Sequence, residues 1–218
     1  MLDFSVLTGH FNQYLRGLGN TLAVSVITLC ASLFWGVILA VMRIVKSRLL
    51  NVAGTVYVEF IRNIPFVLIV FIFYYGAASF AINLNGFVAG ALGLTVYTSA
   101  FIAETVRAGI LSISKGQMEA ARASGMTYSQ SMRYIILPQA MRVVIPPLGN
   151  QFLNLIKNTS VLGLIAGFDL MYYGDLVQSD TFQTFDVYIF VAVFYLLLTI
   201  PLSFAVKYLE RRLARVDA

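Results

Sequence analysis

Charged residues are scarce in this chain: they make up 11% of its 218 residues, whereas soluble domains carry about 25%. Hydrophobic residues make up 59% of the chain, and the mean hydropathy is +0.82. One transmembrane helix needs about 20 apolar residues, and several runs of that length are visible. The composition therefore predicts a single all-α integral membrane domain over residues 1–218, with no room for a sizeable soluble domain.

The chain is also poor in the residues that most enzymes and metal sites need. It has one cysteine, Cys30, and one histidine, His10. An intrachain disulfide is therefore excluded, and so are a multi-histidine metal site and most histidine-dependent hydrolases. The sequence contains no G-x-x-x-x-G-K-[ST], H-E-x-x-H or G-x-S-x-G motif. We expect no bound metal, no cofactor held by this chain and no enzymatic activity, so any ATP must be bound by a different polypeptide.

Apolar runs separated by short polar segments set the expected membrane topology. We expect residues 1–19 to lie on the membrane surface and the stretch up to Arg62 to start as an interfacial helix. Residues 168–186, with four aspartates and no Lys or Arg, are predicted to form an acidic loop. Pro146–Pro147 is predicted to kink the run that contains it. The five predicted spans are residues 21–42, 65–80, 87–110, 143–164 and 187–208.

The positions of Lys and Arg predict how these spans are oriented. Nearly all basic residues fall in 43–48, 107–142 and 207–215. These segments alternate with the uncharged turn 81–86 and the acidic stretch 168–186. Because cytoplasmic loops carry the excess of Lys and Arg, the N-terminus is expected outside and the C-terminus in the cytoplasm. The net charge of +5 then reflects topology rather than binding of nucleic acid.

Residues 114–138 form a polar segment between apolar runs. Ser114 with Gln117, and Thr127 with Gln130, have the spacing of a capping box, so two short helices are predicted. Gly125 stands where the first helix should stop, because glycine adopts the left-handed stop conformation without a Cβ penalty. Pro138 is predicted to end or kink the second helix near Leu137. The first helix is too short to be stable alone, so it is expected to dock in a groove of a partner.

The same segment resembles the EAA signature of ABC-transporter permease subunits. That resemblance implies a type I importer permease fold, in which the segment forms cytoplasmic coupling helices that dock on a separate ATPase subunit. ATP and Mg²⁺ would be bound there and not by this chain. The residues that match the signature, and that are the expected ATPase-coupling residues, are Glu119, Ala120, Ala121, Gly125, Ile135, Leu137 and Pro138.

The whole chain is similar to the polar amino-acid subfamily of these permeases. The similarity is carried by AETVRAGI (103–110), PQAMRVVIPPLGNQF (138–152) and LIKNTSV (155–161). It implies a multi-pass protein of the bacterial inner membrane that pairs with itself or with a sibling permease. It further implies two copies of the ATPase and an extracytoplasmic amino-acid-binding protein as partners.

Polar side chains at membrane depth are the candidate substrate-binding residues, because an ionisable group in hydrocarbon is costly unless paired or hydrated. On the fourth span they recur at i, i+4, i+7 and i+8 from Asn150, which places them on one helical face. Amides together with an ammonium suit a zwitterionic amino acid, whose carboxylate and amine both need partners away from water. The candidates are Thr98, Ser99, Glu104, Arg107, Gln151, Asn154, Lys157 and Asn158.

Other interpretations of these residues stay open at this stage. Glu104 and Arg107 are three residues apart and can simply neutralise each other, and Lys157 can extend its amine to the membrane surface. The resemblance implies that residues 156–160 lie near the bound amino acid. A neutral Asn158 there implies glutamine or glutamate rather than arginine or lysine. The alternative function is an ion-coupled secondary transporter, which the coupling segment and the absence of internal repeats disfavour.

Overall fold

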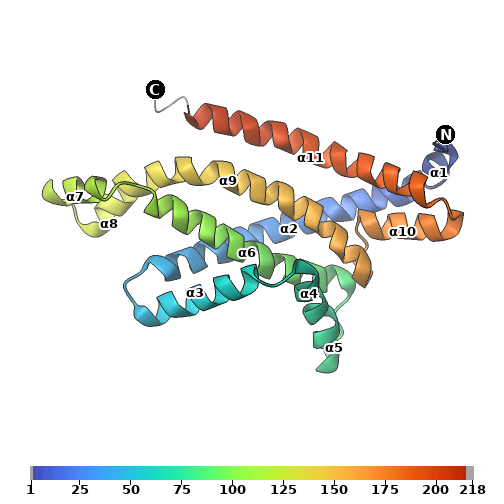
Figure 1. Cartoon of the computed structure of the whole chain (residues 1–218), viewed down its shortest axis with the longest axis horizontal. Helices are drawn as coiled ribbons and strands as arrows, with labels where there is room; N and C mark the ends of the chain where they lie inside the picture. The colour runs from blue at the N-terminus through green and yellow to red at the C-terminus, as the bar shows by residue number, and fades with distance from the viewer. Residues whose placement is uncertain (1, 215–218) are drawn as a thin grey trace.

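The computed structural model describes residues 2–214, and every regular element in that range is helical. Figure 1 shows α2, α6, α9 and α11 running along the long axis, with α7 and α8 at one end and α1 and α10 at the other. This is the all-α architecture predicted from the composition. The α-helices in chain order are α1 (Phe4–Gly9), α2 (Phe11–Ile44), α3 (Arg48–Arg62), α4 (Phe66–Phe71), α5 (Ala77–Ser79), α6 (Gly86–Leu111), α7 (Lys115–Ala123), α8 (Tyr128–Ser131), α9 (Leu137–Asn158), α10 (Leu170–Thr181) and α11 (Thr184–Ala214).

Three of the helices in residues 2–214 are long and apolar enough to cross a membrane: α2, α6 and α11. The number rises to five if each of two bent pairs counts as one span. One pair is Arg48–Arg62 with Phe66–Ser79, bent by 106°, and the other is Tyr128–Ile165 with Leu170–Thr181, bent by 47°. The predicted spans 21–42, 87–110 and 187–208 fall inside α2, α6 and α11. The fold class is therefore confirmed.

Small side chains on α2 let α6 approach it closely. Thr21, Thr28 and Ser32 are buried on the face that Gly36 continues. A Cβ atom on Gly36 would lie 2.6 Å from Cγ2 of Ile102 on α6, closer than side chains pack. Such small-residue interfaces are typical of helices that associate in lipid, where dispersion contacts between backbones replace the hydrophobic effect.

The region of the second predicted span is broken. α3 ends at Arg62, Pro65 precedes α4, and a π-helical turn over Ile72–Gly76 joins α4 to α5. The segment Phe66–Ser79 is only about 21 Å long at 1.5 Å per residue, less than the roughly 30 Å of a hydrocarbon core. Phe66–Ser79 is too short to cross the membrane alone. A span in this region would also need α3, so the span predicted over residues 65–80 stays a prediction.

Of the two alternatives predicted near Leu137, the helix end is wrong and the kink stays a prediction. α8 continues through a π-helical turn over Met132–Ile136 directly into α9, which has Pro138 in its first turn and runs on through Pro146–Pro147. The wider π turn changes the hydrogen-bond register just before Pro138, where the missing N–H of proline is tolerated. One helical path therefore leads from the polar segment to Asn158.

Most of the stretch 168–186 is helical rather than the predicted loop, because α10 covers Leu170–Thr181. Asp169 begins α10 by accepting hydrogen bonds from the backbone N–H groups of Met171 (3.0 Å) and Tyr172 (3.2 Å). Tyr195 of α11 donates its hydroxyl to the same carboxylate at 3.2 Å. The acidic residue that suggested a solvated loop is thus a buried helix cap.

Candidate functional site

A polar pocket of about 220 Å³ lies between α6 and α9. Gln151, Asn154 and Asn158 line it from α9, and Thr98 lines it from α6. Spacings of three and four residues place these α9 amides on one helical face. Of the stripe predicted from Asn150, only Asn154 and Asn158 are among the residues that line the pocket. Within residues 2–214 none of these three amide side chains has a hydrogen-bond partner. The pocket therefore presents free donors and acceptors to a ligand.

Two aromatic residues of the same pocket were missed by the sequence analysis. Tyr97 and Phe101 of α6 line it, and their ring centroids lie 4.8 Å apart. The ring of Phe66 on α4 contacts that of Tyr97 in a tilted arrangement, with the centroids 5.0 Å apart. The available signal was the spacing of Tyr97, Thr98 and Phe101 along one turn of α6. An apolar wall facing a few polar groups is typical of small-molecule sites.

Four of the eight predicted residues do not line this pocket. Ser99 is buried, donates to the carbonyl of Val96 at 2.9 Å and lies 3.3 Å from the hydroxyl of Tyr57. Lys157 is exposed and is not among the residues that line the pocket. The structure thus brings four of the predicted residues together and leaves four outside this pocket. Those in the pocket are Thr98, Gln151, Asn154 and Asn158, and those outside it are Ser99, Glu104, Arg107 and Lys157.

A second cavity of about 450 Å³ adjoins the first. Phe101 and Gln151 line both cavities, and Glu104 and Arg62 line only the second. The Arg62 guanidinium lies 5.5 Å from the centroid of the Phe101 ring, a cation–π distance. The two cavities are adjacent between α6 and α9, and Phe101 and Gln151 lie at the boundary between them.

Glu104 and Arg107 form an ion pair. This agrees with one of the interpretations left open by the sequence, that the two residues neutralise each other. Nη2 of Arg107 lies 2.6 Å from Oε1 of Glu104, and Nε donates to Oε2 at 3.1 Å. Arg43 of α2 donates to the same Oε2 at 2.5 Å, and Glu59 of α3 lies 3.3 Å from Arg43. Arg62 completes the cluster at 3.9 Å from Glu59 and 4.0 Å from Glu104. The cluster joins α2, α3 and α6 on one side of the second cavity.

Sequence reasoning missed Arg43, Glu59 and Arg62 in this cluster. Arg43 was assigned to a cytoplasmic loop, whereas its side chain is 6% exposed. The signal available in the sequence was an unusual number of ionisable residues close to the ends of apolar runs. Nothing in the local sequence shows which distant carboxylate each arginine meets.

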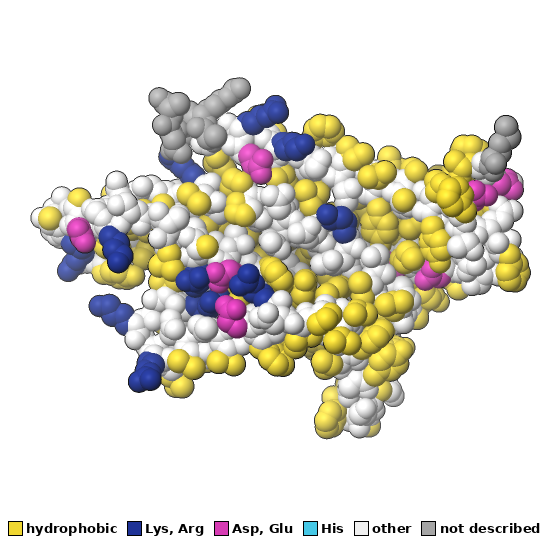
Figure 2. Space-filling model, viewed as in Figure 1, with side chains coloured by type: hydrophobic (Ala, Val, Ile, Leu, Met, Phe, Trp, Pro, Cys, Tyr) yellow, Lys and Arg dark blue, Asp and Glu magenta, His cyan; other side chains and the backbone are white. Residues whose placement is uncertain are grey.

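The polar segment 114–138 forms an exposed tip. Only Ala121 of α7 is buried, while Glu119 and Ala120 face outward. Leu137 and Pro138 are exposed at the start of α9, and Ile135 is half-buried in the π turn. Figure 1 places α7 and α8 at the far end of the molecule from α10, and Figure 2 shows Lys and Arg gathered over that half.

The turn between α7 and α8 follows the predicted chemistry with one exception. Gly125 has φ of +83°, and the N–H of Met126 donates to the carbonyl of Ala121 at 3.2 Å, closing the helix end. The capping box of Thr127 and Gln130 is confirmed by reciprocal bonds of 2.8 and 3.3 Å. The predicted capping box at Ser114 is wrong, because its hydroxyl accepts from the N–H of Gly116 and not from that of Gln117.

The chain matches a known protein family and several characterised relatives. The family profile described as "Binding-protein-dependent transport system inner membrane component" matches residues 32–215. The chain is 61% identical over 214 residues to the "Probable glutamine ABC transporter permease protein GlnM" of Bacillus subtilis (strain 168), covering 98% of this chain and 99% of that protein. It is 35% identical over 214 residues to the "Glutamine transport system permease protein GlnP" of Escherichia coli (strain K12), covering 97% of each.

The fold also matches solved structures. A chain from "Crystal structure of an amino acid ABC transporter with histidines" superposes with a TM-score of 0.92 at 32% identity, covering 97% of this chain and 99% of that chain. A chain from "Inward facing conformations of the MetNI methionine ABC transporter: CY5 native crystal form" superposes with a TM-score of 0.78 at 22% identity, covering 93% and 97%. The second match concerns the fold alone.

Proposed function

Since the chain belongs to the family of binding-protein-dependent transport system inner membrane components, we propose that it is the membrane-spanning subunit of an ATP-driven amino-acid importer with glutamine as its favoured substrate. The observation that carries the choice of substrate is the neutral, amide-lined pocket between α6 and α9. The names of the two glutamine permeases to which the chain is similar support the same choice.

The chemistry of the pocket suits a neutral side chain better than a charged one. Its polar lining consists of amides and hydroxyls, and no charged side chain is among the lining residues. A ligand with a cationic side chain would lie there without a counter-charge, which is unfavourable away from water. The side-chain amide of glutamine can both donate to and accept from Asn154 and Asn158. For the same reason glutamine is favoured over glutamate.

The energy for import is proposed to come from a separate ATPase subunit that binds ATP and Mg²⁺. The exposed α7, with Glu119, Ala120 and Ala121, would dock in a groove of that subunit, and Gly125 sets the angle of the following turn. α8, the π turn and α9 form one helical path from this tip to Asn158. α9 alone is about 33 Å long. A displacement of α7 by ATPase closure would therefore reach the substrate pocket through a stiff element.

The remaining partners and the orientation follow from the same proposal. The chain would pair with a second permease subunit, a copy of itself or a sibling, and bind two ATPase subunits. The end that carries α7 would face the cytoplasm and the end that carries α10 would receive an extracytoplasmic binding protein. The gathering of Lys and Arg at the α7 end (Figure 2) supports this orientation. The N-terminus would then lie outside and the C-terminus in the cytoplasm of a bacterial cell.

The test is ATP hydrolysis by the chain reconstituted in lipid with the ATPase that co-purifies with it. A panel of polar amino acids is supplied, each with its binding protein, and each binding protein without ligand serves as the control. Stimulation by glutamine above glutamate, arginine and histidine supports the proposal. Stimulation by arginine alone would overturn the choice of substrate, and absence of any co-purifying ATPase would overturn the coupling.

A further inference from the structure

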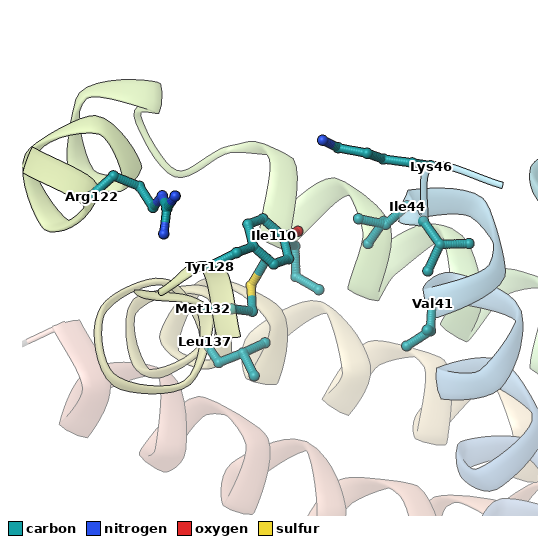
Figure 3. A pocket seen from close by; sticks show the side chains of 9 residues that line it. Val41, Ile44, Lys46, Ile110, Arg122, Tyr128, Met132 and Leu137 are labelled. Atoms are coloured by element: carbon teal, nitrogen blue, oxygen red, sulfur yellow. The ribbon is translucent and has the colours of Figure 1, made fainter. Parts of the chain in front are cut away.

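An open pocket of about 660 Å³ lies between the end of α2 and the polar segment, and Leu137 is the one expected ATPase-coupling residue among the described residues that line it. Its walls are apolar: Val41 and Ile44 come from α2, Ile110 from α6 and Leu137 from α9. Two cations border it, Lys46 just after α2 and Arg122 in α7. Figure 3 shows Lys46 and Arg122 reaching toward each other from opposite sides of the apolar side chains.

The two cations are available to a ligand. Lys46 is exposed and forms no ion pair among residues 2–214. Arg122 donates through Nη1 to the carbonyl of Met126 at 2.7 Å. A guanidinium has five N–H donors, so most of those of Arg122 remain free. An anionic group held between them would be contacted by both α2 and α7.

The pocket is placed where a membrane-spanning helix ends. Ile44 is the last residue of α2, and Val41, one turn earlier, is 51% exposed. Exposed apolar side chains continue from the pocket along both walls, with Val37 on α2 and Met141 on α9. The apolar surface thus leads from the lipid-facing sides of two helices to a pair of cations.

From this arrangement we propose that the pocket binds an anionic phospholipid. Its phosphate lies between Lys46 and Arg122, and the upper part of an acyl chain lies against Val41, Ile110 and Leu137. A small soluble anion would leave the apolar walls exposed to water, which is unfavourable for surface of this kind. A zwitterionic lipid such as phosphatidylcholine also carries a phosphate, but its own quaternary ammonium lies close to that phosphate and is repelled by Lys46 and Arg122. The bound lipid would tie the end of α2 to α7.

Lipid binding is measured on the full-length chain by native mass spectrometry, in detergent with phosphatidylglycerol or phosphatidylcholine of identical acyl chains. Phosphatidylglycerol should bind more tightly. Lys46→Gln should weaken its binding about fivefold, because each cation near an anionic lipid contributes on the order of 1 kcal/mol, and Val41→Trp should weaken it by filling the pocket. Lys207→Gln, which removes an exposed cation of α11 outside the pocket, is the matched control and should leave binding unchanged.

Three results would overturn the lipid site. They are equal binding of the two lipids, an equal loss for Lys207→Gln and Lys46→Gln, and full competition by soluble glycerophosphate. Since no ATPase or amino acid is present, the outcome does not depend on the transport function. A negative result for lipid binding would therefore not contradict the proposed importer role. A negative result for transport would likewise not contradict the lipid site.

Discussion

Arg43 near the end of α2 and Glu104 in α6 form a direct ion pair across 61 residues of sequence, with Nη1 of Arg43 2.5 Å from Oε2 of Glu104. The Arg43 side chain is 6% exposed and that of Glu104 is 23% exposed. Arg107 occupies the second oxygen of Glu104. One carboxylate thus holds two guanidinium groups, and it fixes α2 to α6 beside the cavity that adjoins the amide-lined pocket.

Replacing Glu104 by glutamine should destabilise the protein substantially. Arg43 would keep its buried charge without this carboxylate, and removing one partner of a buried pair costs roughly 3 kcal/mol. Thermal unfolding of the purified protein checks this. Glu59→Gln is the matched control, because the Glu59 side chain is 51% exposed and exposed pairs contribute below about 1 kcal/mol. Equal losses of stability in the two variants would contradict the structural role of Glu104.

Asn158→Asp should shift ligand preference toward cationic amino acids. A carboxylate in the amide-lined pocket can pair with a guanidinium or ammonium side chain, and such charged bonds are stronger than neutral ones. We expect ATP hydrolysis stimulated by arginine, relative to that stimulated by glutamine, to rise about tenfold. Asn150→Asp places the same charge on an exposed position of α9 outside the pocket and should leave the ratio unchanged. An unaltered ligand ranking in Asn158→Asp removes Asn158 from the site.

Gly125→Ala should weaken coupling between ATP hydrolysis and transport. Gly125 has φ of +83°, and an L-residue there costs about 1 kcal/mol or more, so the stop conformation after α7 becomes less populated. Substrate-stimulated ATP hydrolysis should fall by up to about fivefold. Gly116→Ala adds the same methyl group within α7, where the nearest atom is 3.5 Å away, and serves as the control. A larger effect of Gly116→Ala would show that the turn at Gly125 is not what positions α7.

Gly36→Ala tests the contact between α2 and α6. Its Cβ would lie 2.6 Å from Ile102, so the helices must separate, and overpacking of this kind costs about 1–3 kcal/mol. The unfolding temperature should drop. Gly19→Ala introduces a methyl group on the same helix with nothing within 4 Å and should not lower it. An unchanged unfolding temperature for Gly36→Ala would mean that the two helices pack less closely than described.

The sequence was sufficient for the features that depend on local pattern. Hydropathy predicted an all-α membrane protein, and the EAA signature predicted the permease resemblance that the relatives confirm. Helical spacing predicted that Asn154 and Asn158 share one face, and backbone chemistry predicted the conformation of Gly125. Each of these follows from residues within about twenty positions of one another.

Features that depend on distant packing could not be predicted in this way. The carboxylates that pair with Arg43 are Glu59 on α3 and Glu104 on α6. Composition alone does not show which carboxylate a given arginine meets. α10 was taken for a loop because four aspartates suggested solvent, whereas Asp169 is a buried cap that meets Tyr195 of α11. The helix does not end near Leu137, which was one of two predicted alternatives, because a π turn with no clear sequence signal lies directly before Pro138.

Uptake of labelled glutamine into proteoliposomes that contain this chain, its co-purifying ATPase and a glutamine-binding protein tests the central claim most directly. Accumulation should require ATP on the ATPase side and should be unaffected when sodium and proton gradients are collapsed. Excess unlabelled glutamine should block the signal, and arginine should not. Accumulation without ATP or ATPase, driven by an ion gradient, would contradict the account and identify the chain as a secondary transporter.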